Sequence, residues 1–317
     1  MDKPYVIGMD IGGTNTVFGI VDARGNVLSK SAVKTSKHQD INLYIDEIYK
    51  ELSVLIEKAG GISKIKGIGV GAPNGNHYTG NIEYAPNLQW RGVIPLSKLM
   101  SDKFGVPTVI TNDANAAAIG EMTYGAARGM KNFIMITLGT GVGSGIVIDG
   151  KLVYGHDGFA GELGHTCSIR NGRLCGCGRH GCLEAYASAN GVARTAKEIL
   201  QNQNVDSLLR NTPIESITSK DVHYAALQGD KIALEIFEFT GKILGEAMAD
   251  FVAFSAPEAV ILFGGLTKAG DYIMKPIVNH LEKNLLQIWQ GKIKVLFSGL
   301  KESDAAVLGS SALAWEI

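Results

Sequence analysis

Two glycine-rich turns are the first candidates for chemistry in this chain. Apolar runs at residues 5–9 and 133–138 lead into turns at residues 10–15 and 139–145, and strand-like sequence follows each turn. Glycine has no Cβ, so backbone N–H groups at such turns can close on a phosphate, and Thr and Asn side chains add donors. Either turn alone is also typical of an ordinary hairpin. Because the same order of strands and turns recurs, we expect a nucleotide held in a cleft between two duplicated domains.

The turns do not fit two common nucleotide-binding patterns. A dinucleotide-binding fold places a helix directly after its glycine-rich turn, whereas strand-like sequence follows both turns here. Neither turn contains the Gly-Lys-Ser/Thr of a Walker loop. The sequence therefore argues against a Rossmann dehydrogenase and against a P-loop enzyme.

Asp113 is the candidate catalytic base. It lies in the segment Thr111-Asn112-Asp113-Ala114-Asn115, after an apolar run and before a helix-like run. Transfer of a γ-phosphoryl group to an alcohol needs a carboxylate within hydrogen-bond reach of the hydroxyl, donors to the phosphate oxygens, and a Mg²⁺ ion that spreads charge. The alternative interpretation is that Asp113 only caps the N-terminus of the helix.

Four cysteines within residues 167–182 indicate a metal site. A disulfide framework would spread its cysteines along a small secreted chain, whereas three of these lie on one glycine-rich loop. The three loop cysteines are Cys175, Cys177 and Cys182. Structural zinc takes four nitrogen or sulfur ligands, and three Cys with one His is a common set. Residue types alone leave the fourth ligand open among His165, Cys167 and His180, and buried or redox-active thiols are the alternative to metal.

The hydrophobic pattern predicts α/β domains that position these residues. Apolar side chains recur at helical spacing over residues 41–59, and short apolar runs bounded by glycine or proline indicate buried strands. Helices are expected at 41–59, 95–104, 116–124, 184–203, 218–228 and 231–254, and from 272 and 304, and strands at 65–71, 107–111, 259–263 and 294–297. No low-complexity linker interrupts this order, so we expect the domains to share a hinge near residue 112.

Composition limits the classes of function. A chain of 317 residues with 45% apolar content can form two domains, each with its own core. A formal charge of −1 provides no polycationic surface, so nucleic acid is not an expected partner. The first residues lack a basic n-region, and no stretch reaches the roughly 18 apolar residues of a membrane span. We therefore expect a soluble, cytoplasmic protein.

Five motifs in series resemble those of one family. They are Asp10-Ile-Gly-Gly-Thr14, Asn112-Asp-Ala-Asn-Ala-Ala117, Leu138-Gly-Thr-Gly-Val-Gly143, Gly161-Glu-Leu-Gly-His165 and the cysteine loop Cys175 to Glu184. Together they resemble the ROK family of sugar kinases and sugar-responsive repressors, within the hexokinase/actin/Hsp70 superfamily, over essentially the whole chain.

The resemblance implies a fold and a domain division. It implies two actin-like (ribonuclease H-like) α/β domains with a cleft between them and a zinc knuckle in the larger one. Residues 1–112 plus 304–317 form the expected small N-terminal domain, and residues 113–303 form the larger C-terminal domain.

The resemblance also implies a role for each matching residue. Asp113 matches the catalytic base, and Asp10 matches the residue that holds the Mg²⁺ of MgATP through water. The nucleotide set is Asp10, Gly12, Gly13, Thr14, Asn15, Thr140, Gly141, Gly264 and Gly265. The sugar set is Asn87, Asn112, Asp113, Glu162, His165 and Glu184. The zinc set is His165, Cys175, Cys177 and Cys182, so that one ring nitrogen of His165 binds zinc while the other faces the sugar.

The implied activity is ATP-dependent phosphorylation of a hexose at its 6-hydroxyl, with ATP, Mg²⁺ and structural Zn²⁺ as cofactors. Glucose is the expected sugar because Glu162, His165 and Glu184 are all present. Fructose, mannose, N-acetylglucosamine and N-acetylmannosamine are alternatives, since the shape of loops decides between them. One departure bears on this point. Many family kinases continue Gly-Pro-x-Asp-like after the Gly-Ala-Pro loop, whereas residues 74–77 read Asn-Gly-Asn-His here.

A sugar-sensing transcriptional regulator is the alternative class. Repressors of the family carry a winged-helix domain ahead of the first phosphate loop, whereas that loop begins ten residues into this chain. We therefore expect an enzyme. Glu162 and Glu184 have the further alternative of being surface or capping carboxylates. By analogy with the family, we expect a homodimer or homotetramer.

Overall fold

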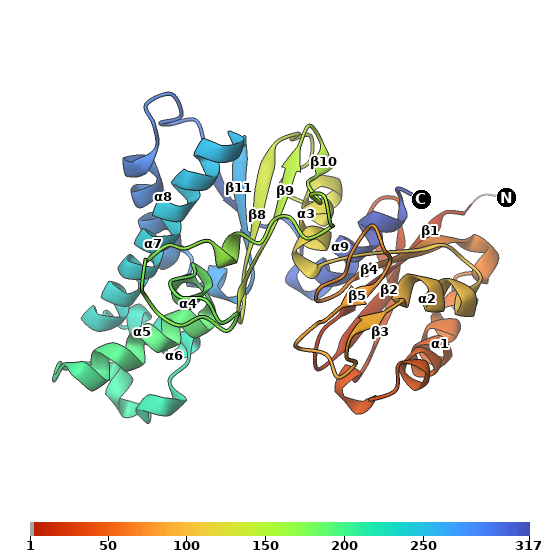
Figure 1. Ribbon diagram of the computed structural model, residues 1–317, viewed down its shortest axis with the longest axis horizontal. Coiled ribbons are helices and arrows are strands. Elements are labelled where there is room, and N and C mark those ends of the chain that lie inside the picture. The colour runs from red at the N-terminus through yellow and green to blue at the C-terminus, as the bar shows by residue number, and fades with distance from the viewer. Residues whose placement is uncertain (1–2) are drawn as a thin grey trace. The chain divides into compact units, whose positions relative to one another are not determined.

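The computed structural model describes residues 3–317, apart from the side chains of residues 302 and 303. The described chain forms two compact units and contains two five-stranded sheets (Figure 1). The first unit comprises Met1–Met130, Gly145–Gly161 and Ser298–Ile317, and the second comprises Lys131–Ser144 and Glu162–Phe297.

These units divide the chain differently from the predicted domains, 1–112 plus 304–317 and 113–303. Helix α3 (Asp113–Tyr124) belongs to the first unit because it packs against α9 (Glu302–Ala314). The segment 145–161 also belongs to the first unit. The predicted hinge near residue 112 stays a prediction.

The first sheet has the strand order β3-β2-β1-β4-β7. These strands are β1 (Tyr5–Ile11), β2 (Thr16–Asp22), β3 (Val27–Val33), β4 (Ile65–Gly71) and β7 (Thr108–Thr111). The first three strands are antiparallel neighbours, while β4 and β7 run parallel to β1. A small hairpin of β5 (Ile82–Glu83) and β6 (Val93–Ile94) accompanies this sheet.

The second sheet repeats this order as β10-β9-β8-β11-β12. Its strands are β8 (Phe133–Leu138), β9 (Val142–Ile148), β10 (Lys151–Leu152), β11 (Ala259–Phe263) and β12 (Lys294–Phe297). Strand β10 is antiparallel to β9, whereas β11 runs parallel to β8 and β12. Strand β9 begins in the second unit and ends in the first. The repeated strand order confirms the duplication predicted from the sequence.

Alternation along β1 distributes its side chains to the two faces of the first sheet. Ile7 and Met9 lie in the core formed with α1 (Ile41–Lys58) and α2 (Leu96–Phe104), whereas Val6 packs with α9. Gly8 shares the α9 face, where a Cβ would lie 2.0 Å from the carbonyl oxygen of Val307. A side chain at Gly8 would therefore push α9 away from the sheet.

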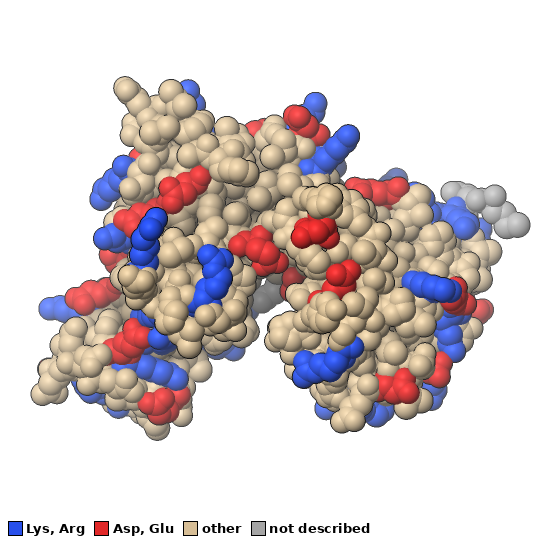
Figure 2. Space-filling view, in the orientation of Figure 1, with Lys and Arg blue, Asp and Glu red and all other residues tan. Residues whose placement is uncertain are grey.

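The second unit buries its core beneath helices. These helices are α4 (Glu184–Ala187), α5 (Ala189–Asn202), α6 (Ser219–Leu227), α7 (Lys231–Ser255) and α8 (Asp271–Asn284). The region 184–203 that was predicted to be helical consists of two helices, because Ser188 ends α4 and caps α5 by accepting the Gly191 N–H at 3.0 Å. Across residues 3–317, none of the helices is long and apolar enough to cross a bilayer. Figure 2 shows basic and acidic side chains interspersed on the face in view.

Candidate functional site

The two candidate carboxylates lie at one edge of the first sheet, near the ends of β1 and β7. Asp10 pairs with Gly71 across β1 and β4, and Gly71 pairs with Thr111 across β4 and β7. Parallel strands end at one edge of a sheet, so these three residues form a row there. Asp113 follows Thr111 by two residues. At Gly71 a Cβ would lie 3.4 Å from Oδ1 of Asp10, so a larger residue would crowd this carboxylate.

Asp113 is the first residue of α3 and is not its N-cap. The cap is Asn112, whose side-chain Oδ1 accepts the N–H of Asn115 at 2.6 Å. Oδ1 of Asp113 accepts the N–H of Ala114 at 2.9 Å, and the Asp113 side chain is exposed to solvent. The residue that caps α3 is therefore Asn112, and the alternative that Asp113 serves as the cap is wrong. Capping occupies the amide oxygen of Asn112 and leaves its amide nitrogen for another partner.

Both carboxyl groups are harder to ionise than an ordinary aspartate. Burial and, as the smaller cause, the negative charge of Asp113 together raise the pKa of Asp10 to about 7. Partial desolvation by the surrounding protein also raises the pKa of Asp113, and the N–H of Ala114 that it accepts acts against this rise. A bound cation would relieve the repulsion between the two carboxylates, so this pair fits a magnesium site.

The first glycine-rich turn joins β1 to β2. It is closed by the Gly12 N–H, which donates to the Asn15 carbonyl at 2.9 Å, and the side chains of Thr14 and Asn15 are exposed. A Cβ on Gly13 would lie 2.6 Å from the backbone oxygen of Asn87. Gly13 therefore brings the predicted nucleotide turn into close contact with the predicted sugar residue Asn87.

The second turn joins β8 to β9 in the second unit. The Gly139 N–H donates to the Gly141 carbonyl at 3.0 Å, and Thr140 is exposed at the tip. Oε2 of Glu184 accepts the Val142 N–H at 3.0 Å, and it would lie 2.4 Å from a Cβ on Gly141. The predicted nucleotide turn and the predicted sugar residue Glu184 are thus in direct contact.

Gly264 and Gly265 follow β11 at the same sheet edge as the second turn, since Phe263 pairs with Thr137 on β8. Gly264 has a positive φ of 111°, and a Cβ there would lie 2.6 Å from the Leu138 carbonyl. Only glycine satisfies both conditions. Oγ1 of Thr137 accepts the Gly143 N–H at 3.1 Å and so supports the second turn. Thr137 was not identified from the sequence, although a Thr in an apolar strand beside a glycine-rich turn indicates such a role.

The segment before the cysteine loop packs on the second turn. The Leu163 N–H donates to Oγ of Ser144 at 3.0 Å, and a Cβ on Gly164 would lie 2.0 Å from the Val142 carbonyl. The short helix η3 (Leu163–His165) follows Glu162, whose side chain is exposed. This packing fixes the position of His165.

Three cysteines and one histidine converge in the second unit. Their ligand atoms lie within 4.8 Å of one another, and the four residues are His165, Cys175, Cys177 and Cys182. The Cys177 and Cys182 sulfur atoms are 3.7 Å apart, and Nδ1 of His165 is 3.7 Å from Sγ of Cys175. Tetrahedral zinc with bonds of about 2.3 Å separates two sulfur ligands by about 3.8 Å. Burial raises the pKa of the Cys175 thiol, so its thiolate needs a cation beside it. The group therefore fits a zinc ion.

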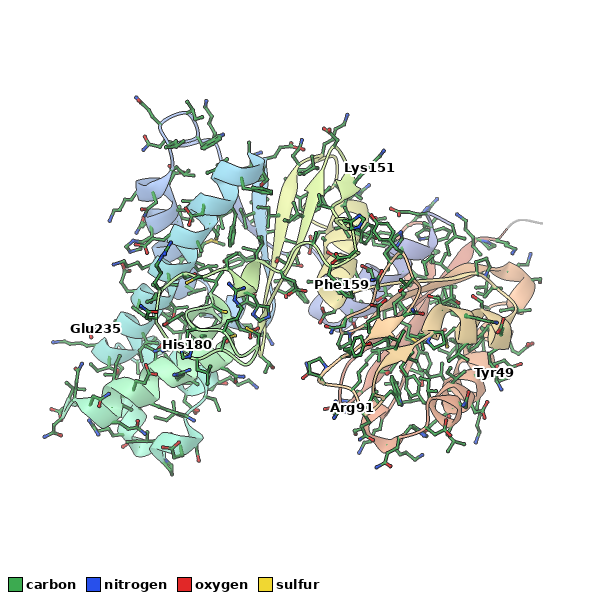
Figure 3. All side chains as sticks on the ribbon, viewed as in Figure 1. Tyr49, Arg91, Lys151, Phe159, His180 and Glu235 are labelled. Carbon is green, nitrogen blue, oxygen red and sulfur yellow. The ribbon has the colours of Figure 1, made fainter. Side chains whose placement is uncertain are left out.

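The other two candidates for the fourth ligand lie outside this group. Cys167 is exposed, and His180, labelled in Figure 3, places Nδ1 3.0 Å from the Gly172 carbonyl. Sequence reasoning missed the support of the loop by Arg173, whose guanidinium donates to Glu198 at 2.5 Å and lies 4.6 Å from the centre of the Tyr186 ring. No sequence pattern marks this contact.

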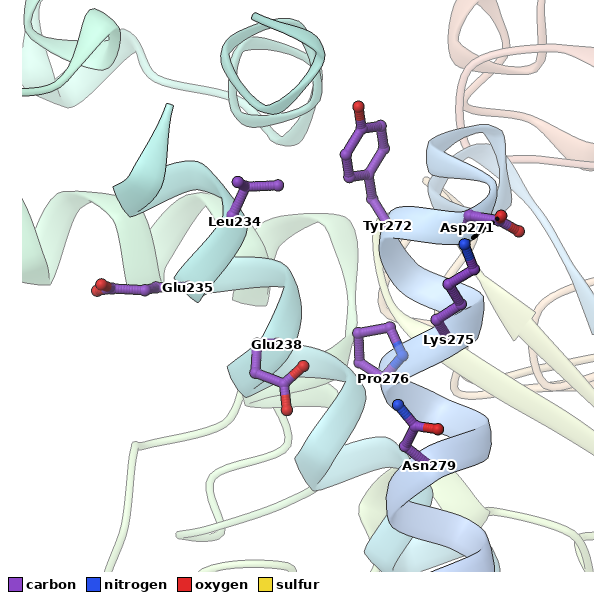
Figure 4. Close-up of a pocket in the computed structure, with 8 residues that line it drawn as sticks. All are labelled: Leu234, Glu235, Glu238, Asp271, Tyr272, Lys275, Pro276 and Asn279. Atoms are coloured by element: carbon purple, nitrogen blue, oxygen red, sulfur yellow. Dashed lines mark ion pairs between the residues drawn. The ribbon is translucent and has the colours of Figure 1, made fainter. Parts of the chain in front are cut away.

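A separate open groove of about 400 Å³ lies between α7 and α8 (Figure 4). Its polar side chains largely pair with one another or with neighbours, as Lys275 does with Asp271 at 2.9 Å and Glu238 with His280 at 2.8 Å. None of the predicted site residues lines it.

Comparison with known proteins matches residues 6–317 to the ROK family. A glucokinase of Halalkalibacterium halodurans is 38% identical, over 99% of this chain and 96% of that enzyme. The crystal structure of a ROK family glucokinase from Streptomyces griseus, in complex with glucose and AMPPNP, is 34% identical with a TM-score of 0.81, over 99% of this chain and 100% of that one. A xylose repressor of Caldicellulosiruptor bescii is 30% identical over 98% of this chain and 78% of the repressor.

Proposed function

Because the chain belongs to the ROK family, within the hexokinase/actin/Hsp70 superfamily, we propose that it transfers the γ-phosphoryl group of ATP to the 6-hydroxyl of glucose. One observation carries this proposal. Asp10, near the end of β1 and beside the first glycine-rich turn, and Asp113, two residues after β7, lie at one edge of the sheet, on parallel strands separated by β4. A phosphate-binding turn and a carboxylate base at one sheet edge are the two parts that phosphoryl transfer to an alcohol requires.

Asp113 acts as the base in this proposal. Its carboxylate accepts the proton of the sugar 6-hydroxyl as that oxygen attacks the γ-phosphorus, and the bond from the γ-phosphorus to the leaving oxygen of ADP breaks. The raised pKa of Asp113 makes its carboxylate a stronger base than a free aspartate. Asp10 would hold Mg²⁺ through water, at a place where the ion would spread the negative charge of the phosphates.

Backbone N–H groups and short polar side chains bind the nucleotide. Gly12, Gly13, Thr14 and Asn15 supply donors to phosphate oxygens from the first turn, and their backbone is free of bulky side chains. Thr140 and Gly141 supply donors from the second turn, while Gly264 and Gly265 allow the adenosine to approach the backbone closely.

The sugar contacts are Asn87, Asn112, Glu162, His165 and Glu184 in addition to the base. Glu184 and His165 are supported by the cysteine loop, since Oε1 of Glu184 is 3.5 Å from Sγ of Cys175 and Nδ1 of His165 faces the same sulfur. Nδ1 of His165 then binds zinc, and Nε2 is left for a sugar hydroxyl. Zinc in this proposal holds the loop that positions these two side chains.

A coupled assay of ADP release tests the proposal. Purified protein is given MgATP and, in turn, glucose, fructose, mannose, N-acetylglucosamine and N-acetylmannosamine. We expect turnover on glucose that falls by about 10³-fold or more in Asp113→Asn, while glucose affinity changes less than about tenfold because hydrogen bonding partly survives. Asp102→Asn is the matched control, since Asp102 is exposed and pairs with Lys98, four residues earlier on the same helix.

Two outcomes contradict the proposal in different ways. Full activity of Asp113→Asn removes the assignment of the base. Turnover on another sugar of the panel and none on glucose replaces the substrate and keeps the reaction.

A sugar-responsive regulator is the second candidate, favoured by the similarity to a xylose repressor along 98% of this chain. Sugar-sensitive binding of genomic DNA fragments in a gel-shift assay, together with no turnover in the kinase assay, would establish the regulator in place of the enzyme. The homodimeric or homotetrameric state and the cytoplasmic location stay predictions.

A further inference from the structure

Three hydroxyl groups meet in the apolar interior of the first unit. Oγ1 of Thr16 lies 2.6 Å from the Tyr44 hydroxyl and 2.7 Å from Oγ1 of Thr35. Thr16 and Tyr44 have no exposed surface, and Thr35 is 2% exposed. Each comes from a different element, since Thr16 begins β2, Thr35 begins η1 (Thr35–Lys37), and Tyr44 lies in the first turn of α1. We call these three residues the hydroxyl triad.

The hydroxyl triad lies directly behind the first glycine-rich turn. Thr16 follows the last residue of the turn, Asn15, and pairs with Ile11 across it. Ser36, which follows Thr35, donates its N–H to the Thr14 carbonyl at 3.3 Å. The buried side of the turn is therefore attached to η1 twice, while its own side chains reach solvent.

The segment that carries Asn87 rests on the same support. The Trp90 ring lies 4.5 Å from the Tyr44 ring, and its Nε1 donates to the His38 carbonyl at 3.2 Å. Gln89 donates through Nε2 to the Ser36 carbonyl at 2.6 Å. Tyr44 thus supports the turn through its hydroxyl and the Asn87 segment through its ring.

A core does not need three hydroxyls for stability. An apolar set of the same shape would avoid the desolvation of polar groups, whereas a satisfied polar network fixes one geometry among several. Burial raises the pKa of Tyr44, so its hydroxyl stays protonated and keeps its donor. Because Thr16 directly follows the first turn, we expect the network to fix the backbone of residues 12–16.

We propose that Tyr44 is a positioning residue for the first phosphate turn, acting through Thr16 and Thr35 without touching the nucleotide. This inference rests on the proposed function, in which that turn binds the phosphates of ATP. Loss of the Tyr44 hydroxyl lets the turn sample other geometries, and nucleotide affinity falls while the ring still supports the Asn87 segment.

Tyr44→Phe tests this inference, and Tyr49→Phe on the same helix is the matched control. Tyr49 (Figure 3) is 41% exposed and contacts Phe104 and Lys103 through its ring. In the kinase assay we expect the KM for ATP of Tyr44→Phe to rise about three- to tenfold, with the KM for glucose within about twofold of the wild type. Tyr49→Phe should match the wild type in both.

Equal KM values for ATP in Tyr44→Phe and the wild type would overturn the inference, and so would equal rises in the two KM values. If Tyr44→Phe does not fold, Thr35→Val removes another hydroxyl of the triad with little change of shape and should raise the KM for ATP selectively. A wild type that turns over no sugar contradicts the proposed function alone. In that case, calorimetric titration with magnesium and AMPPNP still decides whether Tyr44→Phe weakens nucleotide binding three- to tenfold or leaves it unchanged.

Discussion

Replacement of Asp10 by Asn should stabilise the magnesium-free protein while removing its activity. Asp10 ionises with a pKa of about 7, against 3.8 for the ordinary carboxyl group, because it is buried and faces the charge of Asp113. Between these pH values the folded protein binds more protons than the unfolded chain, so stability falls as the pH rises. The stability associated with protonated Asp10 is complete below about pH 4 and lost above about pH 7.

The size of this effect follows from the two pKa values. A difference between 3.8 and about 7 corresponds to about 4 kcal/mol of free energy that disfavours the charged form in the folded protein. Asp10 is only partly shielded from solvent, so we take this as an upper bound and expect about 2 kcal/mol. Asn cannot ionise, and it also relieves the repulsion on Asp113.

Urea unfolding of Asp10→Asn and the wild type in magnesium-free buffer at pH 4 and pH 8.5 measures the effect. We expect Asp10→Asn to exceed the wild type by about 2 kcal/mol at pH 8.5 and by about 0.5 kcal/mol at pH 4, close to the pKa of this carboxyl group in the unfolded chain. Asp102→Asn is the control for removal of an exposed carboxylate. A difference that is the same at both pH values, or a less stable Asp10→Asn at pH 8.5, would refute this reasoning. Kinase activity of Asp10→Asn near that of the wild type would contradict the role of Asp10 at magnesium.

Three other perturbations have defined outcomes. Removal of zinc with a chelator should weaken glucose binding before AMPPNP binding in calorimetry, because His165 and Glu184 both depend on the cysteine loop. Normal glucose binding by the apoprotein would show that the metal has no role in the sugar site. Gly141→Ala should lower kcat/KM for glucose by about tenfold or more, since its Cβ would lie 2.4 Å from Oε2 of Glu184. Gly139→Ala is the control, because its Cβ meets no atom within 4 Å and its activity should be near that of the wild type. Equal activities of the two variants would show that the contact with Glu184 does not matter. Glu121→Ala should lower the free energy of unfolding, measured in urea, by about 3 kcal/mol. The reason is that the fully buried Glu121 carboxylate accepts the Ala126 N–H at 2.7 Å and the Gly299 N–H at 3.2 Å. A loss below about 1 kcal/mol would show that these donors find other partners.

Short-range patterns predicted most of the elements. The strands expected at 65–71 and 259–263 and the helix expected from 231 agree with β4, β11 and α7. Periodicity of apolar residues is a local property, so it is legible without the fold. It did not divide residues 184–203 into two helices, where a serine that caps the second helix interrupts a pattern that remains apolar on both sides.

Candidate site residues could be predicted from the sequence where the residue type itself indicates the chemistry. Three cysteines on one glycine-rich loop predicted the metal group, and an Asp after a buried strand predicted the base. The sequence could not choose among His165, Cys167 and His180, because each is a possible ligand at that spacing. Convergence of the ligand atoms within 4.8 Å selects His165.

Sequence alone determined the duplicated turns and the order of strands and helices, and it supplied the candidate reactive side chains, because these depend on residue type and on neighbours a few positions away. Tertiary structure decided which distant residues meet. Asn112 took the capping role that Asp113 could have filled, and Tyr44 from α1 reached Thr16 behind the first turn. The placement of α3 and of residues 145–161 in the first unit was likewise decided by packing. Contacts between residues far apart in sequence depend on the packing of the complete sheets and helices, and no local pattern encodes them.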